Sequence, residues 1–357
     1  MRILFLYRYG ILGGVCTQLY HRFNSKDRPQ HIEIHCGFAR NYGVEDLLSS
    51  SATLHFGLNR ESLMDLLLEV EFHRIIVIDT QEYIQTVCAA GLSDRLIIET
   101  HTSILANLRY LKELDNGAMR GIITVSKYMR QLIAETIDQS TMSIEVFPNV
   151  LDCDKFTSHD SESKASGLNP MLTWIGKIDD HKDWKSLIRI SELILQKISN
   201  LEIVIIGGET APQERAMELL DFSLESGVIH RLRWIDRVNH DAMVEVYGST
   251  IASRGVILST SKGESFGMAL LEGLLSGAPT VAPRNSAVPE LTEESSGFQL
   301  YPEGDIESAA NICIGLLGES EKWEQAHLDL RGAHGRLRTM YHSGSRAGEY
   351  WNLILEL

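Results

Sequence analysis

Short stretches rich in β-branched residues alternate with longer helical patterns along the chain, and this alternation constrains the fold most strongly. "RILFLY" at 2–7 and "RIIVID" at 74–79 are typical of buried strands, whereas "RESLMDLLLEVEF" at 60–72 has the apolar spacing of a helix. Such alternation predicts parallel sheets with helices on both faces. A second helix is expected at 126–138, with Ser126 as its N-cap. The remaining strands predicted in the first half lie at 31–36, 95–101, 121–126 and 143–149.

The pattern is interrupted once, by "SHDSESKASGLNP" at 158–170, which is polar, small and aperiodic, as in a linker. The 357 residues are too many for one ordinary core, so two domains are predicted, at 1–160 and 168–337. The amphipathic end of the chain, 338–357, is expected to cross back to the first domain. Since open α/β sheets bind ligands at the carboxyl ends of their strands, the cleft between two such domains is the expected site. Strands of the second domain are predicted at 171–176, 201–208, 228–235, 255–260 and 279–283.

The composition excludes several classes of protein. A formal net charge of −15 provides no basic field for nucleic acid, and it argues weakly against an anionic membrane surface. The five cysteines are far apart and form no CxxC, so a disulfide framework or zinc site is not expected. The apolar run at the N-terminus is short and interrupted by arginine, unlike a signal peptide. We therefore expect a cytoplasmic protein, and peripheral contact with a membrane stays open.

In the stretch "ESFGMALLEGLLSGAPTVAPRNSAVPE" at 264–290, Glu264 and Glu272 have no lysine partner three or four places away. A helix is expected at 265–277, ended by Gly277. Glu264 lies in the loop before it, and Glu272 follows eight residues later, roughly 12 Å along a helix and on the same side. Carboxylates accept hydrogen bonds from vicinal diols, and a nucleotide-sugar offers two diol sets. The alternative, a capping acid and a solvated surface acid, is the commoner case for such a pattern alone.

Two lysines follow the predicted strand 171–176. Lys177 and Lys182 lie in the turn before the next helix, where cations can neutralise phosphates. The alternative is a pair of solvated loop lysines.

Glycines and a histidine follow two strands of the first half. Gly10, Gly13 and Gly14 come after the first strand and open a helix, which would let a ligand approach the backbone. The spacing GxGxxG of dinucleotide sites is absent, and a tight turn without a ligand is the alternative. His101 lies where the strand at 95–101 ends, so it would point toward the cleft, although a lone histidine is more often structural.

Together these stretches resemble the retaining glycosyltransferases of family 4 along nearly the whole chain. "ESFGMALLEGLLSGAPTVA" is similar to the family's E-x7-E block, "FPNVLDCDKF" to its "PNGVD...F" stretch, and "WIGKIDDHKD" to its "GRL...KG" segment. "GILGGV" resembles the N-terminal glycine loop, and "EIVIIGG" and "VIHRLRWIDRV" occupy the usual places. The resemblance implies an α/β GT-B fold, with two facing Rossmann-like, doubly wound domains and an interdomain cleft.

The resemblance also implies a role for each candidate residue. Glu272 would bind the ribose of the donor, and Glu264 would contact the transferred sugar. Gly14 would let the backbone approach the β-phosphate. His101 would line the reacting face of the sugar. The diphosphate would be bound by Lys177 and Lys182, and further sugar hydroxyls by the backbone N–H groups of Phe266, Gly267 and Met268.

The implied reaction passes a hexosyl unit from a nucleotide diphosphate sugar, of the UDP-glucose or UDP-GlcNAc type, to an acceptor hydroxyl with retention of configuration. It needs no metal or other cofactor, and the pair Asp179 and Asp180 is interpreted as turn chemistry rather than a metal-binding DxD. The acceptor could be a carbohydrate, a lipid-linked sugar or a small molecule, and no nucleic acid is expected as a partner. Neither the acceptor nor an oligomeric state follows from the sequence.

The chain departs from the family pattern at several positions. Lys177 replaces an arginine, Asp183 and Asp236 replace glycines, and Asn285 and Ser286 replace a glycine-rich turn. These departures leave a second hypothesis open, a non-catalytic nucleotide-sugar-binding protein or partner subunit. A third, an NAD-dependent oxidoreductase, is opposed by the absent GxGxxG. A phosphorylase of the same fold is less favoured, because nothing indicates a pyridoxal lysine.

Overall fold

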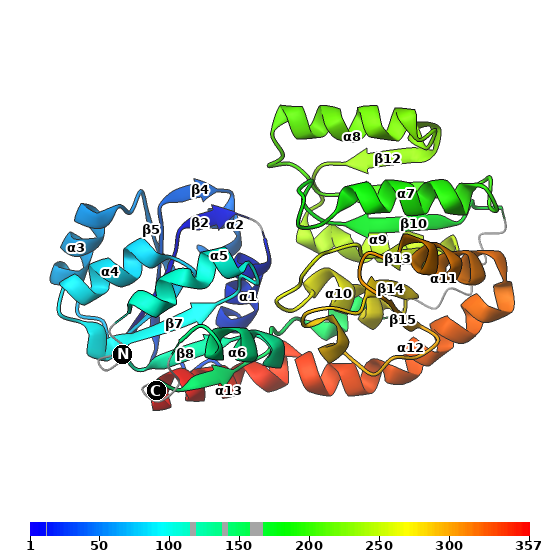
Figure 1. Ribbon diagram of the computed structural model, residues 1–357. Coiled ribbons are helices and arrows are strands. Elements are labelled where there is room, and N and C mark those ends of the chain that lie inside the picture. Colours follow the sequence, from blue (N-terminus) through cyan, green and yellow to red (C-terminus); the bar gives the residue numbers. More distant parts are fainter. Residues whose placement is uncertain (12, 115–118, 138–141, 158–166) are drawn as a thin grey trace. The chain divides into compact units, whose positions relative to one another are not determined.

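The computed structural model describes residues 1–11, 13–114, 119–137, 142–157 and 167–357. These residues form two compact units. The first comprises Met1–Asp152 together with Met340–Leu357, and the second comprises Cys153–Thr339. Each unit is built around one parallel sheet (Figure 1). Most of the predicted linker, residues 158–166, lies outside the described residues.

In the described part of the first unit, one sheet has the strand order β5-β3-β1-β6-β7-β8-β9. Every neighbouring pair in it is parallel, which confirms the α/β prediction. The strands are β1 (Arg2–Tyr7), β3 (Glu33–Phe38), β5 (Thr53–Phe56), β6 (Arg74–Ile78), β7 (Leu96–Thr100), β8 (Gly121–Thr124) and β9 (Ile144–Val146).

Helices follow the strands of this sheet in the manner of doubly wound folds. Ile3 and Phe5 of β1 belong to the same buried cluster as Leu19 and Trp351, so helices from both ends of the chain cover one face. The predicted cap at Ser126 is confirmed, because its hydroxyl accepts the N–H of Met129 at 3.1 Å. The helices are α1 (Gly14–Phe23), α2 (Val44–Leu48), α3 (Arg60–Glu69), α4 (Gln81–Ala89), α5 (Leu105–Leu108), α6 (Lys127–Ala134) and α13 (Ser343–Glu356).

A short ribbon beyond the carboxyl ends of β1 and β3 was not predicted. Its strands β2 (Tyr9–Ile11) and β4 (Arg40–Tyr42) run parallel, with Gly10 opposite Asn41. A Cβ atom at Gly10 would lie 2.5 Å from the carbonyl oxygen of Arg40. Packing of the ribbon therefore explains this glycine, without a ligand.

The second unit has a sheet of order β12-β11-β10-β13-β14-β15, again with parallel neighbours. Trp174 of the sheet, Trp184 of α7 and Cys313 of α11 lie in its main buried cluster, and the two helices pack against each other. The strands are β10 (Met171–Ile175), β11 (Glu202–Ile206), β12 (Leu232–Ile235), β13 (Val256–Leu258), β14 (Thr280–Pro283) and β15 (Phe298–Tyr301), the last of which was not predicted. The helices are α7 (Trp184–Leu195), α8 (Gln213–Glu225), α9 (Met243–Ala252), α10 (Met268–Ser276), α11 (Ile306–Gly318) and α12 (Ser320–Tyr341).

The order of this sheet places two important loops side by side. Strands β10 and β13 are hydrogen-bonded neighbours, and both point the same way. The loops that leave their carboxyl ends, 176–183 and 259–267, therefore emerge at the same edge of the sheet. This edge carries most of the candidate residues predicted from the sequence.

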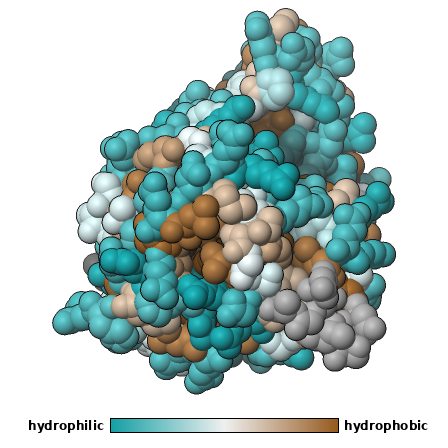
Figure 2. Space-filling view, turned by 90° about the vertical axis from the view of Figure 1, so that its left-hand side faces the viewer, coloured by the Kyte–Doolittle hydropathy of each residue, from teal (hydrophilic) through white to brown (hydrophobic). Residues whose placement is uncertain are grey.

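A helix that spans a membrane needs about 20 consecutive, mostly apolar residues. Within the described part of the chain, no helix is both long and apolar enough to cross a membrane. Figure 2 shows one face of the molecule, where hydrophilic residues predominate and hydrophobic ones gather near the middle. Isolated exposed apolar side chains, such as Leu68 on α3, are normal on protein surfaces.

Candidate functional site

Helix α10 begins at the sheet edge where β13 ends, as predicted. Gly267 is its N-cap, with φ of +100°, a left-handed conformation that favours glycine. Phe266 is buried beside it, and Met268 is the first helical residue. At the other end Gly277 is the left-handed C-cap, which confirms the predicted helix stop.

Glu264 and Lys182 form an ion pair across the two neighbouring loops. The distance from Lys182 Nζ to Glu264 Oε1 is 2.5 Å, and the side chains are 25% and 16% exposed. The backbone N–H of Lys182 donates to Asp179 Oδ1 at 2.8 Å, so Asp179 does have the predicted turn role. Asp180 instead pairs with Arg215 of α8. The ion pair brings together two residues that the sequence assigned to different parts of a donor.

Thr260 ties the two loops to the sheet, and it was not predicted. Its hydroxyl lies 2.8 Å from the carbonyl oxygen of Lys182 and 2.9 Å from that of Asp183. The same oxygen accepts the indole N–H of Trp174 at 2.9 Å. The backbone N–H of Lys262 adds a bond to the carbonyl of His181. Since a threonine after a strand is common in any fold, no local signal distinguishes this one.

Glu272 lies in the second turn of α10 and is only 6% exposed, so it is not a solvated surface acid. Its Oε2 atom accepts a hydrogen bond of 2.9 Å from the hydroxyl of Tyr247 on α9. Burial raises the pKa of Glu272 to about 7, against the lowering effect of that hydrogen bond. Next to it, a Cβ at Gly273 would lie 2.2 Å from Ile257, so α10 packs closely on β13. No motif in the sequence around Tyr247 indicates that it contacts Glu272.

The other predicted binding residues have simpler surroundings. Lys177 is exposed, and no ion pair joins its side chain to another residue of the described segments. Gly14 is the first residue of α1, in the first unit, and a Cβ there would meet nothing within 4 Å. Protein packing therefore does not require glycine at position 14, which is compatible with the predicted approach of a ligand.

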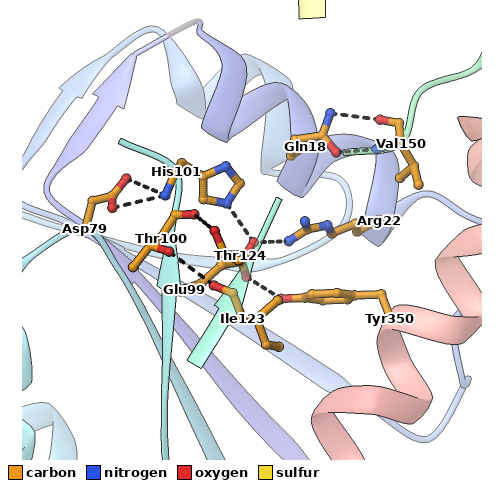
Figure 3. A network of polar contacts seen from close by, with 10 residues as sticks. All are labelled: Gln18, Arg22, Asp79, Glu99, Thr100, His101, Ile123, Thr124, Val150 and Tyr350. Carbon is orange, nitrogen blue, oxygen red and sulfur yellow. Dashed lines mark hydrogen bonds and ion pairs between the residues drawn. The ribbon is translucent and has the colours of Figure 1, made fainter. Parts of the chain in front are cut away.

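His101 follows β7 in the first unit and lies in a network of polar contacts (Figure 3). Its Nε2 atom is 2.7 Å from Oε1 of Glu99. Its backbone N–H donates to both carboxylate oxygens of Asp79, at 3.1 and 3.0 Å. Asp79 is left-handed, with φ of +43°, and burial raises its pKa to about 6. A strained acidic residue next to a predicted catalytic histidine is a feature typical of functional sites.

Glu99 is itself held by two buried partners. Nη1 of Arg22 lies 2.6 Å from Oε1, and the hydroxyl of Tyr350 on α13 donates to Oε2 at 2.7 Å. The Arg22 and Glu99 side chains are wholly buried. Burial opposes ionisation of Glu99, but the charge of Arg22 and the hydrogen bond from His101 outweigh it and hold the pKa below its usual range. The contacts of Glu99 with Arg22 and Tyr350 were not predicted, since both residues lie far from it along the chain.

Two of the departures from the family pattern fall on unusual backbone. Asp183 has φ of +52° and Ser286 has φ of +50°, both in the left-handed region. Glycine adopts this region without strain. This explains why the family pattern has glycine at these two positions. At Asp183 the side chain also accepts a bond from Ser186 at 2.8 Å.

Comparisons with known proteins bear on the second unit most directly. Residues 156–327 match the family model described as glycosyl transferases group 1. Sucrose synthase of Nitrosomonas europaea is 24% identical over 188 residues, which cover 48% of this chain and 23% of that protein. A D-inositol 3-phosphate glycosyltransferase of Corynebacterium efficiens is 26% identical over 153 residues, or 42% and 35% of the two chains. The chain thus spans about a third or less of the length of these two curated relatives.

Solved structures resemble the whole chain in fold. HepE of Anabaena, in complex with UDP-glucose, has a TM-score of 0.82 at 18% identity and covers 100% of both chains. Sucrose-phosphate synthase of Thermosynechococcus elongatus has a TM-score of 0.79 at 13% identity, over 99% and 98% of the two chains. The predicted fold class, two Rossmann-like domains with parallel sheets, is confirmed. The solved structures thus show a GT-B-like fold, and the match to the model of glycosyl transferases group 1 covers slightly less than half of the chain, all of it in the second unit.

Proposed function

We propose that this protein is a retaining glycosyltransferase, which moves a hexosyl unit from a nucleotide diphosphate sugar to an acceptor hydroxyl. The observation that carries the proposal is the pair Lys182–Glu264, a cation and a carboxylate at the start of α10 and at the carboxyl edge of a parallel sheet. Ligands of such sheets bind at this edge. A neighbour in fold that was solved with UDP-glucose supports a donor of that type.

Each residue has a chemical task in this proposal. Lys182 and the exposed Lys177 would offset the charge of the diphosphate, which grows as the sugar departs. Glu264 would accept hydrogen bonds from hydroxyls of the transferred sugar, and Glu272 from the ribose. Gly14 would leave room for the β-phosphate, and His101 would position the acceptor. The backbone at Phe266, Gly267 and Met268 would complete the sugar pocket.

The proposed reaction exchanges one bond for another at the anomeric carbon. The bond from this carbon to the β-phosphate oxygen breaks, and the bond to the acceptor oxygen forms on the same face, through a transition state that resembles an oxocarbenium ion. The acceptor's proton passes to the departing phosphate. Since lysines would supply the positive charge, we propose that no metal is required. Turnover that is unchanged by EDTA is the expected result, and its loss with recovery on Mg²⁺ would refute this part.

A donor screen tests the proposal. UDP-glucose, UDP-GlcNAc and GDP-mannose are each added to the full chain, and the melting temperature and donor turnover are measured. We expect a UDP-sugar to stabilise the protein and to be consumed. Glu264→Gln should lower turnover about 100-fold, the size of effect typical of a lost transition-state contact, while Glu321→Gln, an exposed change in the first turn of α12, should not. Normal turnover by Glu264→Gln contradicts the proposed role.

A non-catalytic nucleotide-sugar binder is the second candidate, and one observation favours it. Lys177 stands where the resemblance leads one to expect arginine, so a point charge replaces a bidentate guanidinium, which would stabilise a departing diphosphate less well. This candidate predicts stabilisation by UDP-sugars with neither transfer nor hydrolysis of the donor across a broad acceptor panel. The donor screen, repeated with this acceptor panel, therefore separates the two candidates.

A further inference from the structure

We propose that Glu99 is a positioning residue, which holds the ring of His101 with Nε2 protonated and leaves Nδ1 to accept a hydrogen bond from a substrate hydroxyl. The C-terminal helix α13 takes part through Tyr350. The role in transfer rests on the proposed function, whereas the state of the ring can be tested without it. Nothing in the sequence pattern pointed to Glu99, because a buried acid two residues before a histidine is a weak signal.

The contact between the two side chains determines where the proton of the ring lies. Glu99 Oε1 is 2.7 Å from His101 Nε2, and an ionised carboxylate can only accept hydrogen bonds. Nε2 must therefore carry the hydrogen, whether the ring is neutral or charged. In the neutral ring, Nδ1 then has the lone pair. No hydrogen bond links Nδ1 to another residue of the described chain, and the His101 side chain as a whole is 7% exposed.

The carboxylate that orients the ring is fixed on both of its oxygens. Oε1 is bound by Arg22 as well as by His101, and Oε2 by the hydroxyl of Tyr350 (Figure 3). The guanidinium of Arg22 lies 4.0 Å from the centroid of the Tyr350 ring, so the two partners also stack on each other. With two anchors from α1 and α13, the carboxylate cannot turn without breaking a buried charged contact.

The backbone of His101 is held separately from its ring. Both carboxylate oxygens of Asp79 accept the backbone N–H of His101. One acid therefore anchors the main chain at the end of β7, and another anchors the imidazole. A histidine that only fills space in the protein does not need both attachments. They are expected where one ring nitrogen must point in a fixed direction toward a ligand.

The arrangement limits the group that His101 can recognise. A lone pair on Nδ1 accepts a hydrogen bond, so its partner must be a donor such as a hydroxyl of a sugar or of the acceptor. A substrate in which that hydroxyl is methylated or replaced by hydrogen would lose the contact. With a neutral ring, the geometry therefore assigns a hydroxyl-bearing ligand to this nitrogen, and not a carboxylate or phosphate.

The tautomer is measured first, on the full chain with ¹⁵N-labelled histidine rings. Long-range ¹H–¹⁵N spectra distinguish protonated from unprotonated ring nitrogens, and His101→Gln assigns the signal. We expect Nε2 protonated and Nδ1 unprotonated at a pH where the ring is neutral. A ring with Nδ1 protonated, or an even mixture of tautomers, overturns the inference whether or not the protein transfers sugar.

Tyr350→Phe tests the anchor without disturbing the charges, since it removes one hydroxyl and keeps the ring against Arg22. Without the bond on Oε2, the ionised carboxylate can turn away from Nε2, so we expect a mixed tautomer signal. Donor turnover should fall about threefold to tenfold, the equivalent of one hydrogen bond, with unchanged affinity for the nucleotide. The matched control is Tyr83→Phe, which removes another buried hydroxyl bond in the same unit, to the carbonyl of Leu58 at 2.9 Å. This control should leave the His101 spectrum and turnover unchanged.

The outcomes separate this inference from the proposed function. If Tyr350→Phe and Tyr83→Phe give the same His101 spectrum and the same turnover as the wild type, Glu99 is not a positioning residue, whether or not the protein transfers sugar. If the wild type consumes no donor, the proposed function fails, and the tautomer spectra of the two variants still decide the inference.

Discussion

Two buried glutamates, one in each unit, differ in the charges around them. Glu99 in the first unit contacts the guanidinium of Arg22 together with His101 and Tyr350. Glu272 in the second unit accepts a bond from Tyr247 and has no cation among its described partners. Burial favours the protonated form of both. The pKa of Glu99 nevertheless lies below its usual range, whereas the pKa of Glu272 is raised to about 7.

The comparison shows that burial alone does not decide whether a carboxyl group is charged. A cation in direct contact outweighs the lost hydration of Glu99, while one phenol hydrogen bond does not do so for Glu272. Glu99 is therefore a permanent anion suited to hold other groups. Glu272 changes its charge near neutral pH, and a pKa shifted in this way is typical of functional carboxyl groups. It lies in the same unit as Lys182 and Glu264.

The largest expected effect comes from Glu99→Leu, which leaves the buried charge of Arg22 without a partner. We expect a loss of about 3–5 kcal/mol in the free energy of unfolding, measured by urea denaturation. The double variant Arg22→Met with Glu99→Leu should recover most of this loss, because no buried charge remains. If Glu99→Leu alone lowers the free energy of unfolding by less than about 1 kcal/mol, the ion pair between Arg22 and Glu99 is not important for stability.

The next effect is a dependence of stability on pH that Glu272→Gln should remove. The folded pKa of about 7 exceeds the ordinary value of 4.5, so the folded state binds the proton more tightly. The contribution of Glu272 to stability is therefore complete below about pH 4.5 and is lost as the pH rises through 7, about 3 kcal/mol in all. Relative to wild type, the Gln variant should gain stability over this window, as followed by the fluorescence of Trp174 and Trp184 in urea. A constant difference across the window would show that Glu272 titrates normally.

A smaller effect separates the two tyrosine partners. Tyr247→Phe removes the hydrogen bond that stabilises ionised Glu272, so its titration midpoint should rise further, by up to about one pKa unit. Tyr350→Phe should leave Glu99 ionised at every pH at which the protein is folded, because Arg22 remains. Carboxyl ¹³C chemical shifts measured against pH report both groups. Equal shifts in the two midpoints would mean that the cation does not dominate at Glu99.

The smallest effect concerns the pair Lys182–Glu264, which is intermediate between the two buried cases because both side chains are partly exposed. A double-mutant cycle with Lys182→Met and Glu264→Gln should give a coupling energy of about 0.5–1 kcal/mol that falls as salt is added. A coupling energy above about 3 kcal/mol would mean that Lys182–Glu264 behaves like the buried ion pair Arg22–Glu99.

Much of the fold could be predicted, because it depends on patterns that repeat over a few residues. The parallel sheets, the cap at Ser126 and the stop at Gly277 follow from local chemistry. Strands β5 and β15 and the β2–β4 ribbon were missed, because short strands without a clear period look like loops. The left-handed backbone at Asp183 and Ser286 was also missed, although the departures from glycine at these positions were noted.

The candidate site was predicted in its residue types and not in its contacts. The sequence by itself determined that Lys182 and Glu264 follow strands and that His101 ends one, because strand and loop patterns are local. Only the tertiary structure decided that Lys182 pairs with Glu264, 82 residues away, and that Tyr350 binds Glu99, 251 residues away. The physical reason is that the order of strands in a sheet, together with the faces that the helices cover, brings distant residues together. The charge state of a buried carboxyl group in turn depends on those neighbours.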